Sequence, residues 1–569
     1  MGETNLTFTQ NFTAVGDSLA LTALVAVIPI LYFFWALAIK KMKGYIAGLT
    51  TLLIALVLAI LAFKVPVGTA VMAGSQGAVY GLLPIGWIII TSVFLYNMTV
   101  KTGQFEIIRH SVLSITEDRR IQALLVAFSF GAFLEGAAGF GAPVAISAAL
   151  LVGLGFNPLY AAGLCLIANT APVAFGAIGV PITAMEGITG IPAIEISKMV
   201  GRQLPFLSVF VPFFLVFIMV GFKKSLEVMP AILVSGVTFA VTQYLTSNFL
   251  GPELPDILSA LVSLFALAIF MKFWQPKNIY RFSAEQEMEA ASAAKNKGQA
   301  DVHYTGGQIF KAWSPFIILT GFISLWGTPV IKQALTGHYE GTNAILKAVN
   351  SLGHTLTLMP EVPFLHNKVI SGATGDPIAA VYKLELLGAA GTAILLAAIV
   401  TKFIFKMAWK DFFATFGHTI NEIKYPLITI CAVVAYAYVA NVAGMTTSMG
   451  MILAKTGALF PFFSPVLGWL GVFITGSDTS ANVLFATLQQ VTATSVGMEP
   501  VLALAANSSG GVTGKMISPQ SIAVACAAVG LAGRESELLR FTLKHSIFLL
   551  FIICCITFLQ STVFTWMIP

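Results

Sequence analysis

Apolar stretches of roughly 20 residues recur along this 569-residue chain, and they are the feature that most limits what it can fold into. A helix needs about 20 apolar residues to cross the hydrocarbon core of a bilayer. Hydrophobic residues make up 57% of the chain and charged residues 10%, whereas a typical soluble domain has about 25% charged residues. This composition excludes a set of soluble domains and predicts an all-α polytopic membrane protein. Twelve spanning helices are predicted, near residues 15–39, 45–63, 83–99, 158–181, 203–221, 226–247, 253–271, 313–332, 384–404, 424–441, 499–530 and 547–566.

Two further apolar stretches, 121–156 and 463–496, are interrupted by glycine-rich polar segments, and we predict that they form re-entrant hairpins. An excess of Lys and Arg marks the cytoplasmic loops of membrane proteins. If the N-terminus lies outside, 22 of the 31 Lys and Arg residues fall on the cytoplasmic side. The count predicts that both termini lie outside the cell. It also requires each hairpin to return to the side from which it entered.

Two long polar segments are predicted to be loops, 272–311 in the cytoplasm and 333–383 outside. The external loop contains His338, His354 and His366, whose spacings of 16 and 12 residues match no compact metal-ligand pattern. We therefore predict no metal site and no cofactor. All five cysteines lie in apolar segments and are interpreted as small buried hydrophobic residues.

The segment 125–182 has a counterpart in the segment 467–525. Both begin with a Phe and a Gly three residues apart, and both then place Gly seven positions and Pro twelve positions after an Asn. The matching residues are Phe133, Gly136, Asn169, Gly176 and Pro181 in the first copy and Phe473, Gly476, Asn507, Gly514 and Pro519 in the second. The copies begin at the third and tenth predicted spans, an odd offset, so they have opposite orientations. Inverted repeats with broken helices are typical of secondary transporters, and chance similarity between Gly-, Ala- and Ser-rich membrane segments is the alternative.

This repeat divides the chain into four predicted parts. Residues 1–82 form N-terminal scaffold helices, 83–221 form the first repeat, 222–423 form linking scaffold helices with the two long loops, and 424–569 form the second repeat.

Each repeat is predicted to contain two interruptions, one at the hairpin tip and one in the following span. The tips are predicted at Gly136, Gly139, Gly141 and Pro143 and at Gly476, Ser477, Thr479 and Ser480, and the breaks at 169–172 and 507–511. Non-helical backbone is tolerated at membrane depth only where protein or a water-filled cavity surrounds it. If the hairpins enter from opposite faces, the four interruptions converge near the middle of the membrane. Their free backbone N–H groups and polar side chains would suit a small anion.

Three ionisable residues lie inside these interrupted elements: Glu135, Asp478 and Lys515. A charge at the centre of a membrane helix costs at least about 2.5–3.5 kcal/mol, so its default interpretation is functional. Lys515 is predicted to bind a substrate carboxylate. Glu135 or Asp478 is predicted to carry a proton, because burial favours the neutral form of a carboxylic acid. The structural alternative is a salt bridge between Lys515 and one of the two acids.

The sequence around Lys515, GGVTGKM, superficially resembles a phosphate-binding loop. It has Ser509 where the first glycine of that motif is required, and it lacks Ser or Thr after the Lys. The Walker pattern is therefore rejected, which argues against an ATP-driven pump.

Four runs of this sequence resemble the bacterial lactate permease family. They are GAFLEGAAGFGAPVAISAALLVGLGF (131–156), ANTAPVAFGAIGVPI (168–182), ITGSDTSANVLF (474–485) and NSSGGVTGKMISPQSIA (507–523), and the similarity covers essentially the whole chain. The resemblance implies a symporter of the bacterial cytoplasmic membrane that takes up lactate, often also glycolate, with protons. It also suggests kinship with transporters in which a domain of hairpins and broken spans slides against a scaffold, the elevator mode. The remaining spans would then form the scaffold and any homodimer interface.

For such a substrate, the predicted binding residues lie on the two broken spans. Asn507 and Ser508 would donate hydrogen bonds to the carboxylate held by Lys515, next to Gly514. The lactate hydroxyl would contact Asn169 or Thr170 of the opposite copy.

We therefore predict a proton-coupled importer of 2-hydroxymonocarboxylates whose partners are the substrate, protons and the lipid bilayer, and not nucleic acid. A sodium-coupled dicarboxylate carrier is the nearest alternative, because Asn and Ser oxygens suit hard cations. A single intramembrane Lys matches one carboxylate better than two.

An intramembrane enzyme would need a nucleophile–base pair or a metal cluster, and neither is found in the sequence. A passive channel is disfavoured by the paired hairpins with buried acid and base.

Overall fold

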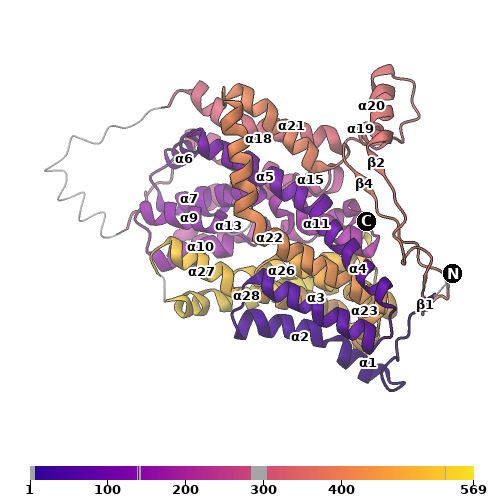
Figure 1. Ribbon diagram of the computed structural model, residues 1–569. Coiled ribbons are helices and arrows are strands. Elements are labelled where there is room, and N and C mark those ends of the chain that lie inside the picture. Colours follow the sequence, from indigo (N-terminus) through magenta and orange to yellow (C-terminus); the bar gives the residue numbers. More distant parts are fainter. Residues whose placement is uncertain (1–6, 138, 140–141, 283–303, 532–533) are drawn as a thin grey trace.

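The structure is a computed structural model, and it describes residues 7–137, 139, 142–282, 304–531 and 534–569. The described chain is almost entirely helical (Figure 1). Ten of its helices are long and apolar enough to cross a membrane, or up to twelve if each of two bent pairs counts as one span. The predicted class, an all-α polytopic membrane protein with about twelve spans, is confirmed at this level.

The first third of the chain contains two antiparallel helices, a long bent rod and a short helix at one end. These elements are β1 (Phe8–Thr9), α1 (Leu19–Ala26), α2 (Ile28–Phe34), η1 (Trp35–Ile39), α3 (Gly44–Leu61), α4 (Val67–Tyr80), η2 (Gly81–Gly86), α5 (Trp87–Lys101) and α6 (Gln104–Leu113). Helices α4 and α5 form a continuous stretch of 35 residues, bent at Leu83 and Pro84. The span predicted at 83–99 is therefore longer than expected, because the helical stretch already begins at Val67. Glycine and polar residues lower the hydropathy there because that surface packs on another helix, with Gly77 against the backbone of Ala435.

The first interrupted segment forms a helical hairpin followed by a broken span. The elements are α7 (Arg119–Ala123), η3 (Leu124–Phe130), α8 (Gly131–Ala137), α9 (Ala142–Gly153), α10 (Pro158–Ala168), η4 (Val173–Phe175), α11 (Gly176–Thr189), α12 (Ala193–Val200) and α13 (Leu204–Val220). Helix α8 ends at the predicted tip, although Gly136 is still helical and Gly141 lies outside the described residues. The chain then bends by 62° between α10 and the helical stretch that begins at Val173. The break predicted at 169–172 is confirmed.

The middle of the chain adds long helices and a partly structured loop. The elements are α14 (Phe222–Leu226), α15 (Met229–Phe249), α16 (Pro255–Phe273), α18 (Gly306–Gly327), α19 (Pro329–Thr336), α20 (Ala344–Thr355), β2 (Thr357–Leu358), β3 (Val369–Ile370), β4 (Leu384–Glu385) and α21 (Ala390–Ile404). Strand β1 pairs in parallel with β3, and β2 pairs with β4 in antiparallel fashion. The N-terminal segment is therefore joined to the segment 333–383.

The last third repeats the order rod, hairpin, broken span and terminal helix. Its elements are α22 (Trp409–Ala443), α23 (Met445–Leu453), η5 (Ala454–Leu459), α24 (Phe460–Thr475), α25 (Asp478–Val496), α26 (Pro500–Lys515), α27 (Pro519–Ala528), α28 (Glu535–Thr562) and η6 (Thr565–Met567). The predicted tip is confirmed: α24 ends at Thr475, Gly476 follows it with a φ of +71°, and Ser477 caps the start of α25.

The predicted break at 507–511 was wrong. Helix α26 runs without interruption to Lys515, and the chain leaves helix only at 516–518. The glycines permit close packing instead, because a Cβ on Gly510 would lie 2.0 Å from the carbonyl oxygen of Pro465 in α24, and one on Gly514 would lie 2.4 Å from that of Trp469. Such small residues four positions apart are typical of tightly packed membrane helices.

Loops that are far apart in the sequence meet in two groups at opposite ends of the helices. At the left of Figure 1, Arg120 pairs with Glu227 at 2.7 Å and the ring of Phe156 contacts that of Phe282. At the right, beside β1, Gln10 donates to the carbonyl of Asn441. Both ends of the first hairpin therefore lie on the left face, as the predicted topology requires.

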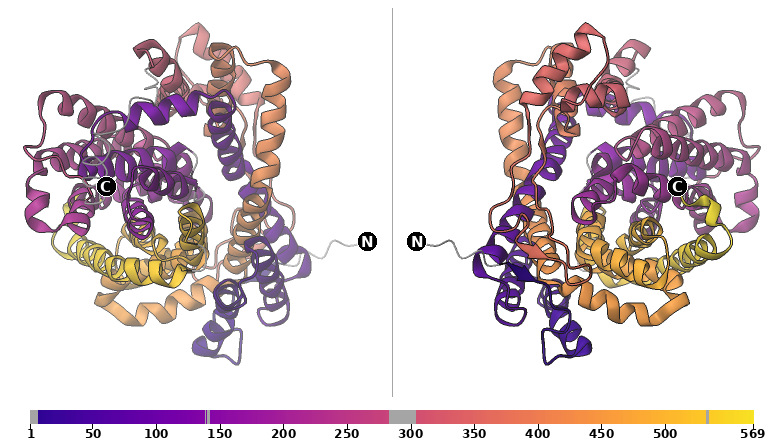
Figure 2. Two further views of the ribbon diagram at one scale, coloured as in Figure 1. Left: turned by 90° about the vertical axis from the view of Figure 1, so that its left-hand side faces the viewer. Right: turned by 90° about the vertical axis from the view of Figure 1, so that its right-hand side faces the viewer.

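The helices also separate laterally. Figure 2 shows the orange helices α21 and α22 with the indigo helices α3 and α4 on one side, and a bundle of magenta and yellow helices on the other. The hairpins and broken spans belong to this bundle, in which α24 packs between α25, α26 and α28.

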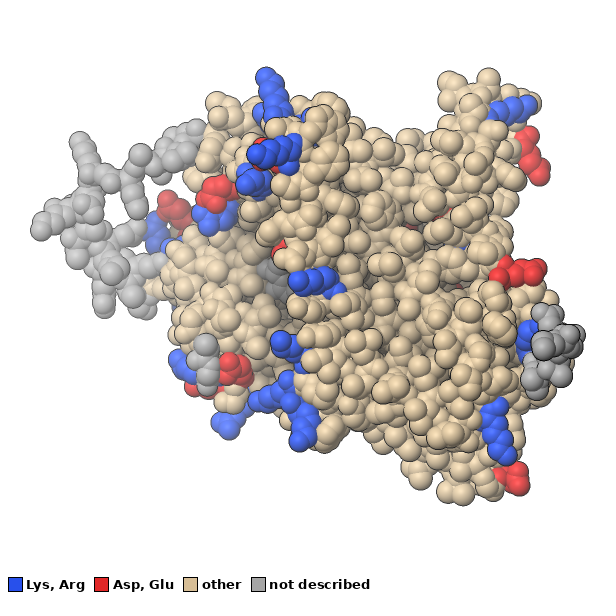
Figure 3. All heavy atoms as spheres, in the orientation of Figure 1, with Lys and Arg blue, Asp and Glu red and all other residues tan. Residues whose placement is uncertain are grey.

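Lys and Arg side chains gather over the left half of the molecule in Figure 3 and are sparse at the right. This distribution predicts that the left face is cytoplasmic.

In a variant without native cysteines, Lys347→Cys should react with an impermeant thiol reagent in intact cells and Lys277→Cys should not, since both positions are exposed but lie on opposite faces. Equal labelling of both would contradict the orientation.

The packing of α26 on α24 gives a stability prediction. Gly510→Ala should lower the melting temperature in detergent, because the added methyl group meets backbone, and overpacking costs about 1–3 kcal/mol. Gly153→Ala in α9 is the control, because nothing lies within 4 Å of its Cβ position. Equal melting temperatures of the two variants would show that the contact is not tight.

Candidate functional site

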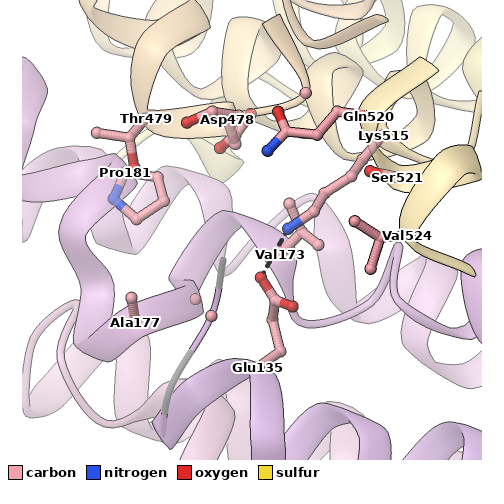
Figure 4. A pocket seen from close by; sticks show the side chains of 14 residues that line it. Glu135, Val173, Ala177, Pro181, Asp478, Thr479, Lys515, Gln520, Ser521 and Val524 are labelled. Atoms are coloured by element: carbon pink, nitrogen blue, oxygen red, sulfur yellow. Dashed lines mark hydrogen bonds and ion pairs between the residues drawn. The ribbon is translucent and has the colours of Figure 1, made fainter. Parts of the chain in front are cut away.

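The two hairpin tips, the break at 169–172 and the break observed at 516–518 meet around one cavity of about 80 Å³ (Figure 4). Its lining comes from both hairpin tips and both broken spans. The residues are Glu135 and Gly139; Val173, Gly176, Ala177 and Pro181; Gly476, Ser477, Asp478 and Thr479; and Lys515, Gln520, Ser521 and Val524. A buried water occupies roughly 10–15 Å³ on this measure, so the cavity has room for several waters or one small organic anion.

Lys515 and Glu135 form an ion pair in this cavity. The Lys515 Nζ lies 2.8 Å from Glu135 Oε1, and the side chains are 10% and 3% exposed. The Glu135 carboxyl lies against the start of α11, where a Cβ on Gly176 would come within 2.9 Å of Oε1. The salt bridge considered as the alternative role of Lys515 is therefore present. An ammonium group has three N–H donors, and Glu135 accepts one of them.

Asp478 lies on the opposite wall of the cavity at the start of α25. Its Oδ2 accepts hydrogen bonds from Ser508 Oγ at 2.7 Å and from Asn482 Nδ2 at 3.1 Å. Its Oδ1 has no partner among the described residues. These two donors fix the carboxyl group in place and leave one oxygen free.

Asn507 and Ser508, predicted to bind substrate, do not line the cavity. Asn507 donates to Asn482 Oδ1 at 2.9 Å and accepts from Gln489 Nε2 at 3.0 Å. Both side chains are fully buried. Because α26 is continuous, these residues face α25 and hold Asp478 in place.

The other predicted ligands also lie away from the cavity lining. Thr170 is buried and donates to the carbonyl of Ile167 at 2.6 Å. Asn169 is buried, and its Nδ2 has no partner among the described residues. Gly514 packs on α24. Of the eight predicted site residues, the structure brings Lys515, Glu135 and Asp478 together at the cavity.

The sequence analysis missed three polar residues. Gln520 and Ser521 line the cavity from the first turn of α27, directly after the break at 516–518, and they were missed because the sequence analysis placed the break at 507–511. Asp256 is fully buried in the first turn of α16, close enough to Glu135 and Lys515 to interact electrostatically. It is the one acidic residue in that apolar helix, a signal that the rule for intramembrane charges would have detected.

A model of the L-lactate permease family matches residues 22–564. The chain belongs to this family. It is 69% identical over 562 residues to the L-lactate permease of Bacillus subtilis (strain 168), covering 99% of this chain and 100% of that protein. It is 52% identical over 571 residues to the glycolate permease GlcA of Escherichia coli (strain K12), with 99% and 100% coverage, and 51% identical over 566 residues to the L-lactate permease of the same strain, with 98% and 99% coverage.

Membership in this family makes the protein a multi-pass membrane permease and not an enzyme. Among solved structures, the YdaH transporter of Alcanivorax borkumensis gives a TM-score of 0.45 at 13% identity, covering 87% of this chain and 88% of that chain. That similarity is too weak to assign a shared fold.

Proposed function

We propose that this family member is a symporter that imports lactate, and also glycolate or related 2-hydroxymonocarboxylates, together with protons across the bacterial cytoplasmic membrane. The observation that carries the proposal is the buried Lys515–Glu135 pair in a small cavity where both hairpins and both broken spans meet. The relatives named as L-lactate and glycolate permeases indicate the substrate class.

Lys515 is the anchor for the substrate carboxylate. A buried cation is stable only beside an anion, and in this structure Glu135 supplies that anion. An incoming carboxylate forms charge-assisted hydrogen bonds with the same ammonium group. Substrate and Glu135 therefore compete for one positive charge.

This competition couples the substrate to a proton. Once lactate neutralises Lys515, an ionised Glu135 is left buried without a cation, which is costly. Protonation of Glu135 removes that cost, so the anion and the proton bind together. Asp478 is the second candidate for the proton, since it lines the same cavity and one of its oxygens has no partner among the described residues.

The 2-hydroxyl group has polar partners within the cavity itself. Thr479, Gln520 and Ser521 line it, whereas Asn169 and Thr170 do not. We assign recognition of the hydroxyl to these three side chains in place of the residues expected from the sequence.

An inverted repeat and elevator movement complete the proposal. Two helical stretches of 35 residues, α4–α5 and α22, carry a Pro at the same position, Pro84 and Pro426, and α10 and α26 both begin with Pro. These matches support the two copies at 83–221 and 424–569, with each copy extended at its start by a rod. The bundle of hairpins and broken spans would slide against the remaining spans, with both termini outside.

The first test addresses Lys515. Lys515→Met should weaken the binding of labelled L-lactate in detergent by about 100-fold or more, since truncating one partner of a buried charge pair costs about 2–5 kcal/mol. Lys515→Arg should be partly functional, because a planar guanidinium does not reproduce a compact ammonium. Lys402→Met, at a buried lysine of α21, is the control. Wild-type affinity in a folded Lys515→Met variant would show that the charge is structural.

The second test addresses coupling. In proteoliposomes, Glu135→Gln should abolish lactate accumulation driven by a pH gradient while retaining lactate–lactate exchange, because glutamine cannot take up the coupled proton. Asp478→Asn tests the second acid in the same assay. If both variants accumulate lactate like the wild type, neither acid carries the proton.

Accumulation of lactate or of a dicarboxylate by the wild type in a sodium gradient alone would favour the sodium-coupled alternative.

A further inference from the structure

Asp256 is a buried acid that the proposed mechanism does not use and that forms no salt bridge among the described residues. Its side chain is inaccessible to solvent, and neither of its carboxyl oxygens has a hydrogen-bond partner among the described residues. An ionised carboxylate in such surroundings would be prohibitively costly, whereas the neutral acid is tolerated. Native structures rarely leave both oxygens of a buried carboxyl unpaired, so this group requires an explanation.

Asp256 lies directly against the tip of the first hairpin. A Cβ on Gly136 would come within 2.8 Å of the Asp256 Cβ, so only glycine allows α16 to approach α8 this closely. The neighbouring Glu135 has one oxygen on Lys515, and its other oxygen, Oε2, has no partner among the described residues. Two carboxyl groups with free oxygens therefore lie on adjacent segments.

On the side away from Glu135, the chain that precedes Asp256 lies toward the face of the molecule that carries the N-terminus. Glu253 precedes it by three residues, in the connection between α15 and α16, and is partly exposed. Glu186 and Lys332 are close enough to Glu253 to affect its charge. Burial raises the pKa of the Glu253 carboxyl above the ordinary value for glutamic acid, with Lys332 opposing the shift.

We propose that Glu253, Asp256 and Glu135 form a proton route that leads from the N-terminal face to the cavity, separate from the path of the substrate. The inference rests on the proposed proton-coupled transport. When lactate takes Lys515, the O–H bond of Asp256 breaks and a proton passes to Glu135 Oε2. Asp256 then regains a proton from Glu253, which is reprotonated by water at the N-terminal face. One proton enters for each anion bound, and no buried carboxylate remains without compensation.

The charged residues near Asp256 are consistent with its role in proton transfer. Lys515 and Glu135 are the ionisable groups that act on Asp256, and one positive charge cannot neutralise both acids and a substrate. Asp256 is therefore expected to lack a cationic partner while Lys515 is paired with Glu135. The Asp256 proton becomes available for transfer when the Lys515–Glu135 pair separates.

The test uses the full-length protein in proteoliposomes. Asp256→Asn keeps the size of the side chain and cannot release a proton in this way. Uptake of labelled lactate driven by a pH gradient should fall by about 100-fold, the lower end of the effect of a positioned acid or base. Lactate–lactate exchange, which requires no net proton transfer, should stay within about twofold of the wild type. Ser259→Ala, which removes another buried unpaired oxygen one turn along α16, should leave both rates unchanged.

Each other outcome is also decisive. Normal gradient-driven uptake by Asp256→Asn would overturn the route, and so would loss of exchange in a variant that melts like the wild type. If Asp256→Asn fails to fold, Glu253→Gln decides, because this residue lies outside the helices: wild-type uptake by that variant would overturn the route. A wild-type protein that accumulates no lactate in a pH gradient would instead refute the proposed function itself.

Discussion

The buried ion pair between Lys515 and Glu135 is the interaction on which the rest of the site depends. It joins the second broken span to the tip of the first hairpin, 380 residues apart in the chain. Removing one partner of such a pair typically costs about 3–5 kcal/mol. The elements that carry these residues must therefore stay together unless another anion replaces Glu135, and this requirement connects substrate binding with the charge of the site.

Interrupted helices are tolerated here because close backbone packing surrounds them. Helix α26 approaches α24 at Gly510 and Gly514, and α16 approaches α8 at Gly136, so the helix ends at the cavity are held by protein. Asp478 is fixed by Ser508 and Asn482 in the same way. The polar residues of the repeat thus have two roles: some line the cavity, and others position those that do.

The family assignment and the geometry support one mechanism. In the proposed mechanism, a proton-coupled permease for monocarboxylates uses one cation for the anion and an acid that is neutralised when the anion binds, and Lys515 with Glu135 would supply both. Asp256 adds a carboxyl that lies off the cavity and has no cation of its own, which suits a group that transfers protons and does not touch the substrate. Substrate and proton would then reach the site by different routes.

The sequence alone determined the membrane class, the positions of both hairpin tips and the three charged residues of the cavity, because hydropathy and the cost of intramembrane charge are local properties. Prediction from the sequence failed where the same type of residue can serve different structural roles in different surroundings. The Asn and Gly residues of 507–511 suggested a break, yet they serve helix packing, since only the tertiary structure places α24 against them. Likewise, the pairing of Lys515 with Glu135 joins residues 380 positions apart, and the position of Asn169 and Thr170 outside the cavity lining and the isolation of Asp256 also depend on the tertiary structure. Periodicity and composition carry no information about such contacts.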